Sequence, residues 1–158
     1  MFELVFLLSF TLHNIEEALW LPKWSQYAKK FHPPVAKNEF HFAVLMVTLI
    51  GYVLTFLFLA TGNTNEIVKY LYLGFLLMMA FNSIFPHLIA TIALRRYAPG
   101  TLTGLFLNLP IGLYIVFMLY GETLVPYKLL LGFAVITSLI LGSLKPLFRM
   151  GRKLIDEY

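Results

Sequence analysis

The residues best suited to chemistry stand near the start of the chain, where residues 13–17 read His-Asn-Ile-Glu-Glu. This run places one imidazole and two carboxylates within about one helical turn, inside an apolar stretch long enough to cross a bilayer. A charged side chain at mid-bilayer costs about 2.5 to 3.5 kcal/mol, so such groups persist mainly where they pair, bind a ligand or line a wet cavity. The run is therefore the first candidate for a functional site.

Helical rotation decides which of these side chains act together. Successive residues turn by about 100°, so Glu16 and Glu17 flank His13 on one face while Ile15 points away. Counting back at about 1.5 Å per residue from the basic end of each apolar stretch puts other polar groups at a similar depth, about 10 to 13 Å inside. These are His87, Asn108, Thr137 and Ser138, with Asn82 deeper and His41 at the boundary. Side chains at this depth should face the bundle interior, so we expect one cavity opening toward the basic ends.

Imidazole nitrogens and carboxylate oxygens suit Zn, Fe or Mn, so this cavity is a candidate site for a divalent metal. The expected ligands are His13, Glu16, Glu17 and His87. Catalysis is assigned to His13, Glu16 and Glu17, with one carboxylate left to act as general base. The residues expected to orient a ligand or to contact the substrate are Asn82, Asn108, His41 and Tyr97.

The same residues allow other interpretations. Intramembrane acids and histidines also form proton or cation relays in transporters. A buried hydrogen-bonded network without any ligand is compatible too, because His13 and Glu17 can pair with each other. Asn108 precedes Pro110 and can instead bind backbone carbonyls that the proline leaves free. Residues 97–100 are expected to form a proline-glycine turn, after which Thr101 or Thr103 can cap the fourth helix.

The composition indicates a membrane protein. Hydrophobic residues make up 59% of the chain and charged residues 13%, against about 45–50% and about 25% in soluble domains. The net charge of +4 does not suggest nucleic acid as a partner, because the basic residues lie between apolar runs. The absence of cysteine excludes disulfides and thiolate metal sites. No cleavable signal is expected, because the first apolar run has no basic residues before it.

The apolar residues fall into five stretches of about the 20 residues that a helix needs to cross a bilayer. Lipid offers backbone groups no partner, so all five should be helices, and we predict an all-α, polytopic bundle in one domain, residues 1–148. The predicted spans are 2–21, 41–61, 68–94, 102–120 and 124–144. Residues 22–32 carry aromatic and lysine side chains at helical spacing, which predicts an amphipathic helix at the interface.

Basic residues lie almost entirely at one end of the predicted bundle. The chain has 12 of them, and only Lys69 and Lys128 lie at the other end. The remainder are Lys23, Lys29, Lys30, Lys37, Arg95, Arg96, Lys145, Arg149, Arg152 and Lys153. The positive-inside rule therefore predicts an N-terminus outside, a basic cytoplasmic tail at 149–158, and a place in the cytoplasmic membrane as a multi-pass protein.

Three short motifs resemble one family. The run at 13–17 matches the His-x-x-Glu-Glu pattern that names the HXXEE family of small prokaryotic integral membrane proteins, and Tyr-Ala-Pro-Gly at 97–100 resembles its Tyr-x-Pro-Gly motif. Asn82 and His87 look like its Asn and His pair, although here five residues separate them and Pro86 lies between. The resemblance covers most of the chain. It implies a multi-spanning prokaryotic membrane protein whose motif residues act together, and it implies no activity.

The leading hypothesis is a membrane-embedded hydrolase or transferase with a divalent metal, acting on a lipid or prenyl-type substrate from the cytoplasmic leaflet. A bound metal lowers the pKa of its water to about 7 and polarises a substrate oxygen. The alternatives are a small proton-coupled or cation-coupled transporter and a non-catalytic subunit of a membrane complex. The almost wholly apolar outer half of the predicted bundle argues against transport. The sequence leaves the oligomeric state open.

Overall fold

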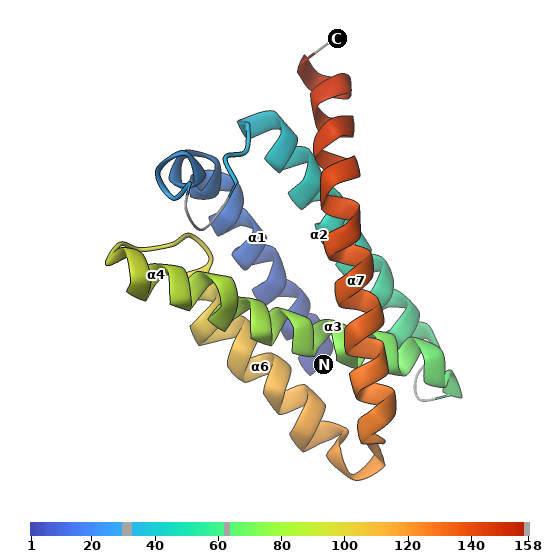
Figure 1. Cartoon of the computed structure of the whole chain (residues 1–158). Coiled ribbons are helices and arrows are strands. Elements are labelled where there is room, and N and C mark those ends of the chain that lie inside the picture. The colour runs from blue at the N-terminus through green and yellow to red at the C-terminus, as the bar shows by residue number, and fades with distance from the viewer. Residues whose placement is uncertain (30–32, 62–63, 157–158) are drawn as a thin grey trace.

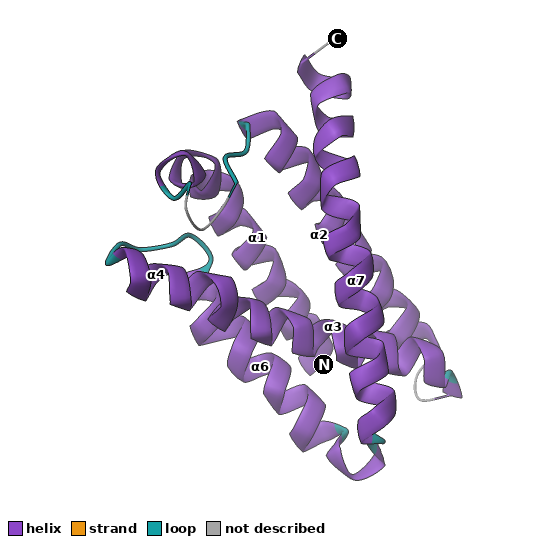
Figure 2. Cartoon of the chain, viewed as in Figure 1, coloured by secondary structure: helices purple, strands orange, loops and turns teal. Residues whose placement is uncertain are grey.

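The computed structural model describes residues 1–29, 33–61 and 64–156, and this part of the chain is helical with short loops (Figure 2). Five helical stretches are long and apolar enough to cross a membrane. They are Phe2–Tyr27, Lys37–Thr61, Glu66–Leu94, Thr101–Leu119 and Pro126–Ile155. The predicted all-α bundle of five spans is confirmed, while the orientation of its termini stays a prediction.

The first two spans are single helices, α1 (Phe2–Tyr27) and α2 (Lys37–Thr61). α1 continues through Pro22 and ends at Tyr27, so residues 22–27 of the predicted interfacial segment prolong the first helix and residues 28–29 follow it as a loop. Residues 30–32 of that segment lie outside the described residues. Proline has no N–H to donate to the carbonyl four residues earlier, which here belongs to Ala18. The His41 Nε2, on α2, lies 2.7 Å from that carbonyl oxygen and donates to it, which ties the two helices together.

The third and fourth spans are irregular. The third span consists of α3 (Glu66–Asn82), a π-helical turn (Ser83–Leu88) and α4 (Ile89–Leu94). The fourth span consists of α5 (Thr101–Thr103), a π-helical stretch (Gly104–Asn108), α6 (Leu109–Leu113) and a second π-helical stretch (Tyr114–Leu119). Within the third span, Phe85 leaves the helical region (φ −122°, ψ 116°) just before Pro86. The expected kink at Pro86 is therefore a local break in the helix, and it lies beside the candidate site.

The last span is α7 (Pro126–Gly151), which follows a 3₁₀ turn (Gly121–Thr123) and continues as a π-helical stretch (Arg152–Asp156). It extends past the apolar run at 124–144, because hydropathy marks only the part of a helix that suits lipid. The last residues of the predicted tail, 157–158, lie outside the described residues.

α7 crosses α3, with α2 beside it, while α1 lies between α2 and the third and fourth spans (Figure 1). Glycines make the crossing of α3 and α7 possible. A Cβ at Gly132 would lie 2.1 Å from the Tyr70 carbonyl oxygen, and one at Gly74 would lie 2.4 Å from the backbone of Gly132. Small residues at such a crossing let two backbones approach closely, which is how membrane helices gain packing energy.

An aromatic core fills the half of the bundle where α1 begins and α2 ends, which we call the closed end. Phe6, Phe10, Tyr72 and Phe75 are completely buried there. The Phe10 and Phe75 rings meet edge to face with centroids 5.1 Å apart, a favourable aromatic geometry. The opposite half, where α1 ends and α2 begins, contains the polar residues predicted to act together, and we call it the cavity end.

Candidate functional site

α1 presents the His-x-x-Glu-Glu residues to the interior, as helical rotation predicts. His13 and Glu16 are buried, whereas Ile15 is half exposed on the opposite face. Glu17 follows on the inward face and keeps part of its side chain accessible. Two neighbouring carboxylates on one helix thus enter different surroundings, and their contacts separate them further.

The break in the third span brings the Asn and His pair together. In a regular helix residues five apart point about 140° away from each other. This regular rotation does not apply between Asn82 and His87, because Phe85 between them is not helical and the chain changes direction there. Asn82 Nδ2 accordingly lies 3.1 Å from His87 Nε2. The spacing that departs from the family pattern therefore still directs both side chains to one place.

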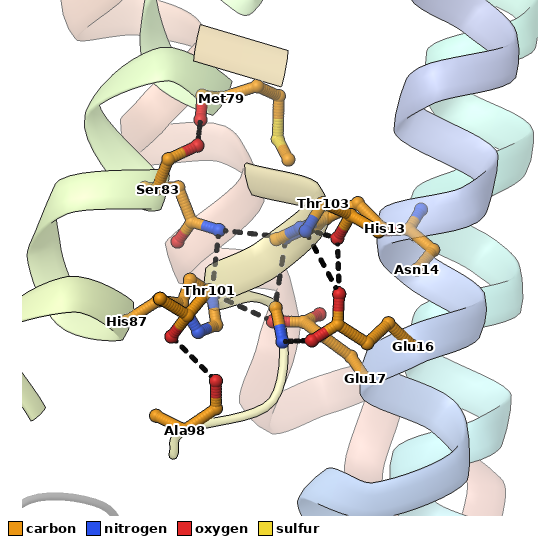
Figure 3. A network of polar contacts seen from close by, with 12 residues as sticks. His13, Asn14, Glu16, Glu17, Met79, Ser83, His87, Ala98, Thr101 and Thr103 are labelled. Atoms are coloured by element: carbon orange, nitrogen blue, oxygen red, sulfur yellow. Dashed lines mark hydrogen bonds and ion pairs between the residues drawn. The ribbon is translucent and has the colours of Figure 1, made fainter. Parts of the chain in front are cut away.

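Three side chains converge at this place from two spans. The His87 Nε2 lies 2.9 Å from Glu17 Oε1, and His13 Nε2 lies 3.7 Å from the same oxygen. One donor atom from each of these residues lies within 4.8 Å of the other two, and the two imidazole rings meet edge to face. The amide of Asn82 closes the group, with Nδ2 3.3 Å from His13 Nε2. Figure 3 shows His13, Glu17 and His87 directed toward one another. We call these four residues the cluster.

Glu16 belongs to a second network instead. Its Oε1 accepts hydrogen bonds from the Tyr97 hydroxyl and from the Gly100 N–H, 2.6 Å away. Its Oε2 accepts from the Thr103 N–H at 3.1 Å and the Thr103 hydroxyl at 2.6 Å. Glu16, predicted as a metal ligand and catalytic residue, thus directs both oxygens to the loop and the fourth span (Figure 3).

The Tyr-Ala-Pro-Gly turn binds Glu16 and contacts the cluster. Gly100 has φ +91°, which glycine adopts without strain, and a Cβ at this position would lie 2.7 Å from His87 Cε1 and 2.9 Å from His13 Cε1. The Tyr97 hydroxyl also accepts a hydrogen bond from the Leu102 N–H. Burial and the bond to Glu16 raise the pKa of Tyr97 to about 12, so it donates as a neutral phenol at ordinary pH. Position 100 needs glycine for two reasons: its φ is positive, and a Cβ there would collide with both imidazole rings.

The cluster lies at one side of a cavity of about 550 Å³. Side chains of α1, α2, the third span and α7 line this cavity, together with Ala98 of the loop, and most are apolar. Phe10 of the aromatic core also borders it. The polar lining residues are His13, Asn14, Glu17, Asn82, His87 and Thr137. Ionisable groups at the border of an apolar chamber can bind the reactive end of a molecule whose remainder is hydrophobic.

Two other predicted residues lie elsewhere. Asn108 is fully buried, but its Oδ1 accepts from the Ser9 hydroxyl at 2.6 Å, and no described group partners its Nδ2. His41 binds the Ala18 carbonyl, as described above. Neither residue lines the cavity.

Thr103 is the contact that sequence reasoning missed. It was expected only as a possible cap of the fourth helix, where no side-chain cap bond occurs. Instead its hydroxyl lies between Glu16 and His13, with Oγ1 3.1 Å from His13 Nδ1. A threonine three residues after the Tyr-x-Pro-Gly turn was the available signal, but its partners lie on a helix about 90 residues earlier in the chain.

Comparison with known proteins places these residues in a wider group. Residues 4–115 match the family described as "Protein of unknown function with HXXEE motif". The chain is also similar to the "Uncharacterized protein YrkK" of Bacillus subtilis (strain 168), at 46% identity over 149 residues that cover 94% of each chain. No solved structure matches the chain. The family match includes every residue of the cluster and of the Glu16 network.

Proposed function

The chain belongs to the HXXEE family, and we propose that it is a membrane-embedded, divalent-metal-dependent hydrolase or transferase acting on a lipid or prenyl-type substrate. The observation that supports this most directly is the convergence of His13, Glu17 and His87 beside an apolar cavity. In this proposal these three residues hold the metal. Glu16, which has no free oxygen, becomes a residue that positions others.

The donor set suits a metal such as Zn, Fe or Mn. Ligand atoms about 2.0 to 2.2 Å from a tetrahedral metal lie about 3.3 to 3.6 Å from one another. Glu17 Oε1 lies 2.9 and 3.7 Å from the two imidazole nitrogens, and no pair of the three atoms is more than 4.8 Å apart, so metal binding would require side-chain movements of about 1 Å. The His87 Nε2 lies 2.9 Å from the acceptor Glu17 Oε1 and 3.1 Å from the donor Asn82 Nδ2, so a single neutral imidazole nitrogen cannot satisfy both neighbours. Rotating the Asn82 amide by half a turn would present its oxygen as a fourth donor.

The metal would supply an activated water, or a Lewis acid for a substrate oxygen. Glu17 is the carboxylate that lines the cavity, so we assign it to accept a proton from an attacking group. The Asn82 amide would orient the polar end of the substrate or the metal. Zn, Fe and Mn all fit these ligand types.

The lining of the cavity supports a hydrophobic substrate. Phe81, Phe85 and Leu141 line the cavity and are also more than half exposed on the outer surface. They belong to the third span and to α7, so the cavity border between these spans faces the bilayer. An acyl or isoprenoid chain can enter there directly from lipid. The positive-inside rule would put this border in the cytoplasmic leaflet.

The aromatic core argues against the transporter alternative. Phe6, Phe10, Tyr72 and Phe75 fill the closed end without accessible surface, so the described residues offer no polar path beyond the cluster. A relay across the membrane would need ionisable or wet groups along the whole route. An enzyme needs access from one side only.

Elemental analysis of the detergent-purified protein tests the proposal. We expect about one Zn, Fe or Mn ion per chain, and loss of that ion in the double variant His13→Ala, Glu17→Ala. The matched control is His41→Asn, which removes a histidine that does not line the cavity. Folded wild-type protein that stays free of metal after incubation with each of these ions would rule out the metal-dependent enzyme.

A further inference from the structure

The hydrogen bonds around Glu16 define its charge. A carboxylate offers about four lone-pair sites, and Glu16 receives four donors, two from Thr103 and one each from Tyr97 and Gly100. The separation of 2.6 Å between the Thr103 hydroxyl and Oε2 is typical of an O–H donor and an ionised acceptor. Glu16 therefore accepts every bond it makes, as an ionised carboxylate.

This charge determines the direction of the next bond. The Thr103 hydroxyl has a single proton, and Glu16 receives it. The hydroxyl can therefore only accept at its contact with His13 Nδ1, 3.1 Å away, so Nδ1 must carry hydrogen. A neutral imidazole with Nδ1–H has a lone pair on Nε2. That nitrogen is the atom of His13 that faces Asn82 and Glu17.

We infer that Glu16 and Thr103 are positioning residues that hold His13 as its Nδ1–H tautomer and direct the Nε2 lone pair into the cluster. The two glutamates of the His-x-x-Glu-Glu run thus have different roles: Glu17 faces the cavity, and Glu16 acts on His13 through Thr103. Hydrogen-bond partners of this kind fix the tautomer and ring orientation of metal-binding histidines. The consequence for metal affinity rests on the proposed function, whereas the tautomer itself does not.

The Tyr-x-Pro-Gly turn has a place in the same arrangement. Tyr97 and Gly100 supply the two donors that occupy Glu16 Oε1, which leaves Oε2 for Thr103. The absence of a Cβ at Gly100 lets this turn lie directly against the imidazoles of His13 and His87. The Tyr-x-Pro-Gly turn and the His-x-x-Glu-Glu run therefore act together to orient the His13 imidazole.

Nitrogen NMR of histidine-labelled protein tests the tautomer without any metal. The chain has four histidines, and the signals of His13 are those that disappear in His13→Asn. We expect Nδ1 of His13 to resonate as a protonated nitrogen and Nε2 as an unprotonated one in the metal-free wild type. The opposite pattern, or an imidazolium with both nitrogens protonated at neutral pH, overturns the inference.

Two variants test whether Thr103 is responsible. Thr103→Val keeps the shape and removes the hydroxyl, so we expect a mixture of His13 tautomers and metal affinity about 10-fold to 100-fold lower. Thr103→Ser restores the hydroxyl and should restore both measurements. Thr55→Val is the control, because the Thr55 hydroxyl donates to the Gly51 carbonyl of its own helix and does not contact His13. An unchanged His13 tautomer in Thr103→Val overturns the inference even if metal affinity falls.

The two proposals can fail separately. A wild-type protein with the expected tautomer but no bound metal would support the positioning role of Glu16 and Thr103 and remove the metal-dependent enzyme. A protein that binds metal through an Nδ1-coordinated His13 would do the reverse.

Discussion

The two ends of the bundle use polar side chains in opposite ways. At the closed end, Lys69 Nζ donates to Thr123 Oγ1 at 3.0 Å, and the Tyr120 hydroxyl donates to Glu3 at 3.0 Å. Each of these groups secures a loop or a chain terminus, and the space between them is filled by the aromatic core. At the cavity end, one nitrogen or oxygen atom from each of His13, Glu17 and His87 lies within 4.8 Å of the others, beside the cavity.

Two carboxylates on the same helix illustrate the difference. Glu3 and Glu17 both lie on α1, but Glu3 is held by a tyrosine and the N-terminal amino group, whereas Glu17 faces two histidines and a cavity. Buried polar groups that satisfy one another stabilise a fold, and groups that converge on a shared point reduce stability unless a ligand joins them. The following predictions challenge this division, beginning with the largest effect.

The crossing of α3 and α7 should tolerate no added volume. Gly132→Ala puts a methyl group against a backbone carbonyl of Tyr70, which cannot rotate away, so we expect a loss of about 3 kcal/mol or more in the free energy of unfolding. Gly142→Ala on the same helix meets no atom within 4 Å and should gain about 0.5 to 1 kcal/mol. Denaturation by SDS in mixed micelles measures both, and equal effects would contradict the close crossing.

A methyl group at the turn should damage the cavity end. Gly100→Ala meets both imidazoles and forces a positive φ on alanine, which costs about 1 to 2 kcal/mol, and we expect bound metal to be lost. Gly121→Ala, in the loop at the closed end, has open space and should keep its metal. Metal content and thermal stability are measured together. Retention of metal in Gly100→Ala would show that the turn does not support the cluster.

Single substitutions at the two ends should separate stability from binding. Tyr120→Phe removes one hydrogen bond to Glu3, so stability should fall by about 1 kcal/mol while metal content stays the same. Glu17→Gln should lose metal and leave stability equal or higher, because it removes a charge from an apolar cavity. If Glu17→Gln instead destabilises the metal-free protein more than Tyr120→Phe does, the cluster has a structural role.

The smallest effect should be a common response to alkaline pH. Burial and hydrogen bonds to Glu16 and Glu3 raise the pKa of Tyr97 and Tyr120, respectively, to about 12, above the ordinary value of 10. The stabilisation from each is therefore complete below about pH 10 and is lost as pH rises toward 12. Tyrosinate absorbance of the wild type minus that of Tyr97→Phe or Tyr120→Phe measures each ionisation. A midpoint near pH 10 for either would mean that its bond to the carboxylate is absent in solution.

The inward-facing residues of α1 at the cavity end could be predicted, because the direction of a helical side chain depends only on its position along the helix. The inward face of α1 follows from a rotation of about 100° per residue, and cost in lipid explains why His13 and Glu17 point inward. The different roles of Glu16 and Glu17 could not be predicted. Both side chains point inward, and helical rotation does not show which residue of another span each one contacts. For Glu16 that residue is Thr103, on a helix far along the chain.

The contact between Asn82 and His87 also could not be predicted from their spacing in the sequence. Five residues on a regular helix separate two side chains, and a proline predicts a kink without its direction. The non-helical Phe85 between them changes the direction of the chain and brings the two side chains together. Similarly, His41 seemed suited to the site by type, but the carbonyl that Pro22 leaves free on α1 gave it a partner elsewhere.

Hydropathy and residue spacing alone were enough for the number of spans, their helical state and the candidate residues, because lipid permits few backbone structures and makes every intramembrane charge conspicuous. The division of those candidates into a converging cluster, a positioning network and structural bonds depended on contacts between spans. Such contacts are set by where helices break and cross, through glycines, prolines and one threonine hydroxyl, and these positions follow from packing in three dimensions rather than from the order of residues along a helix.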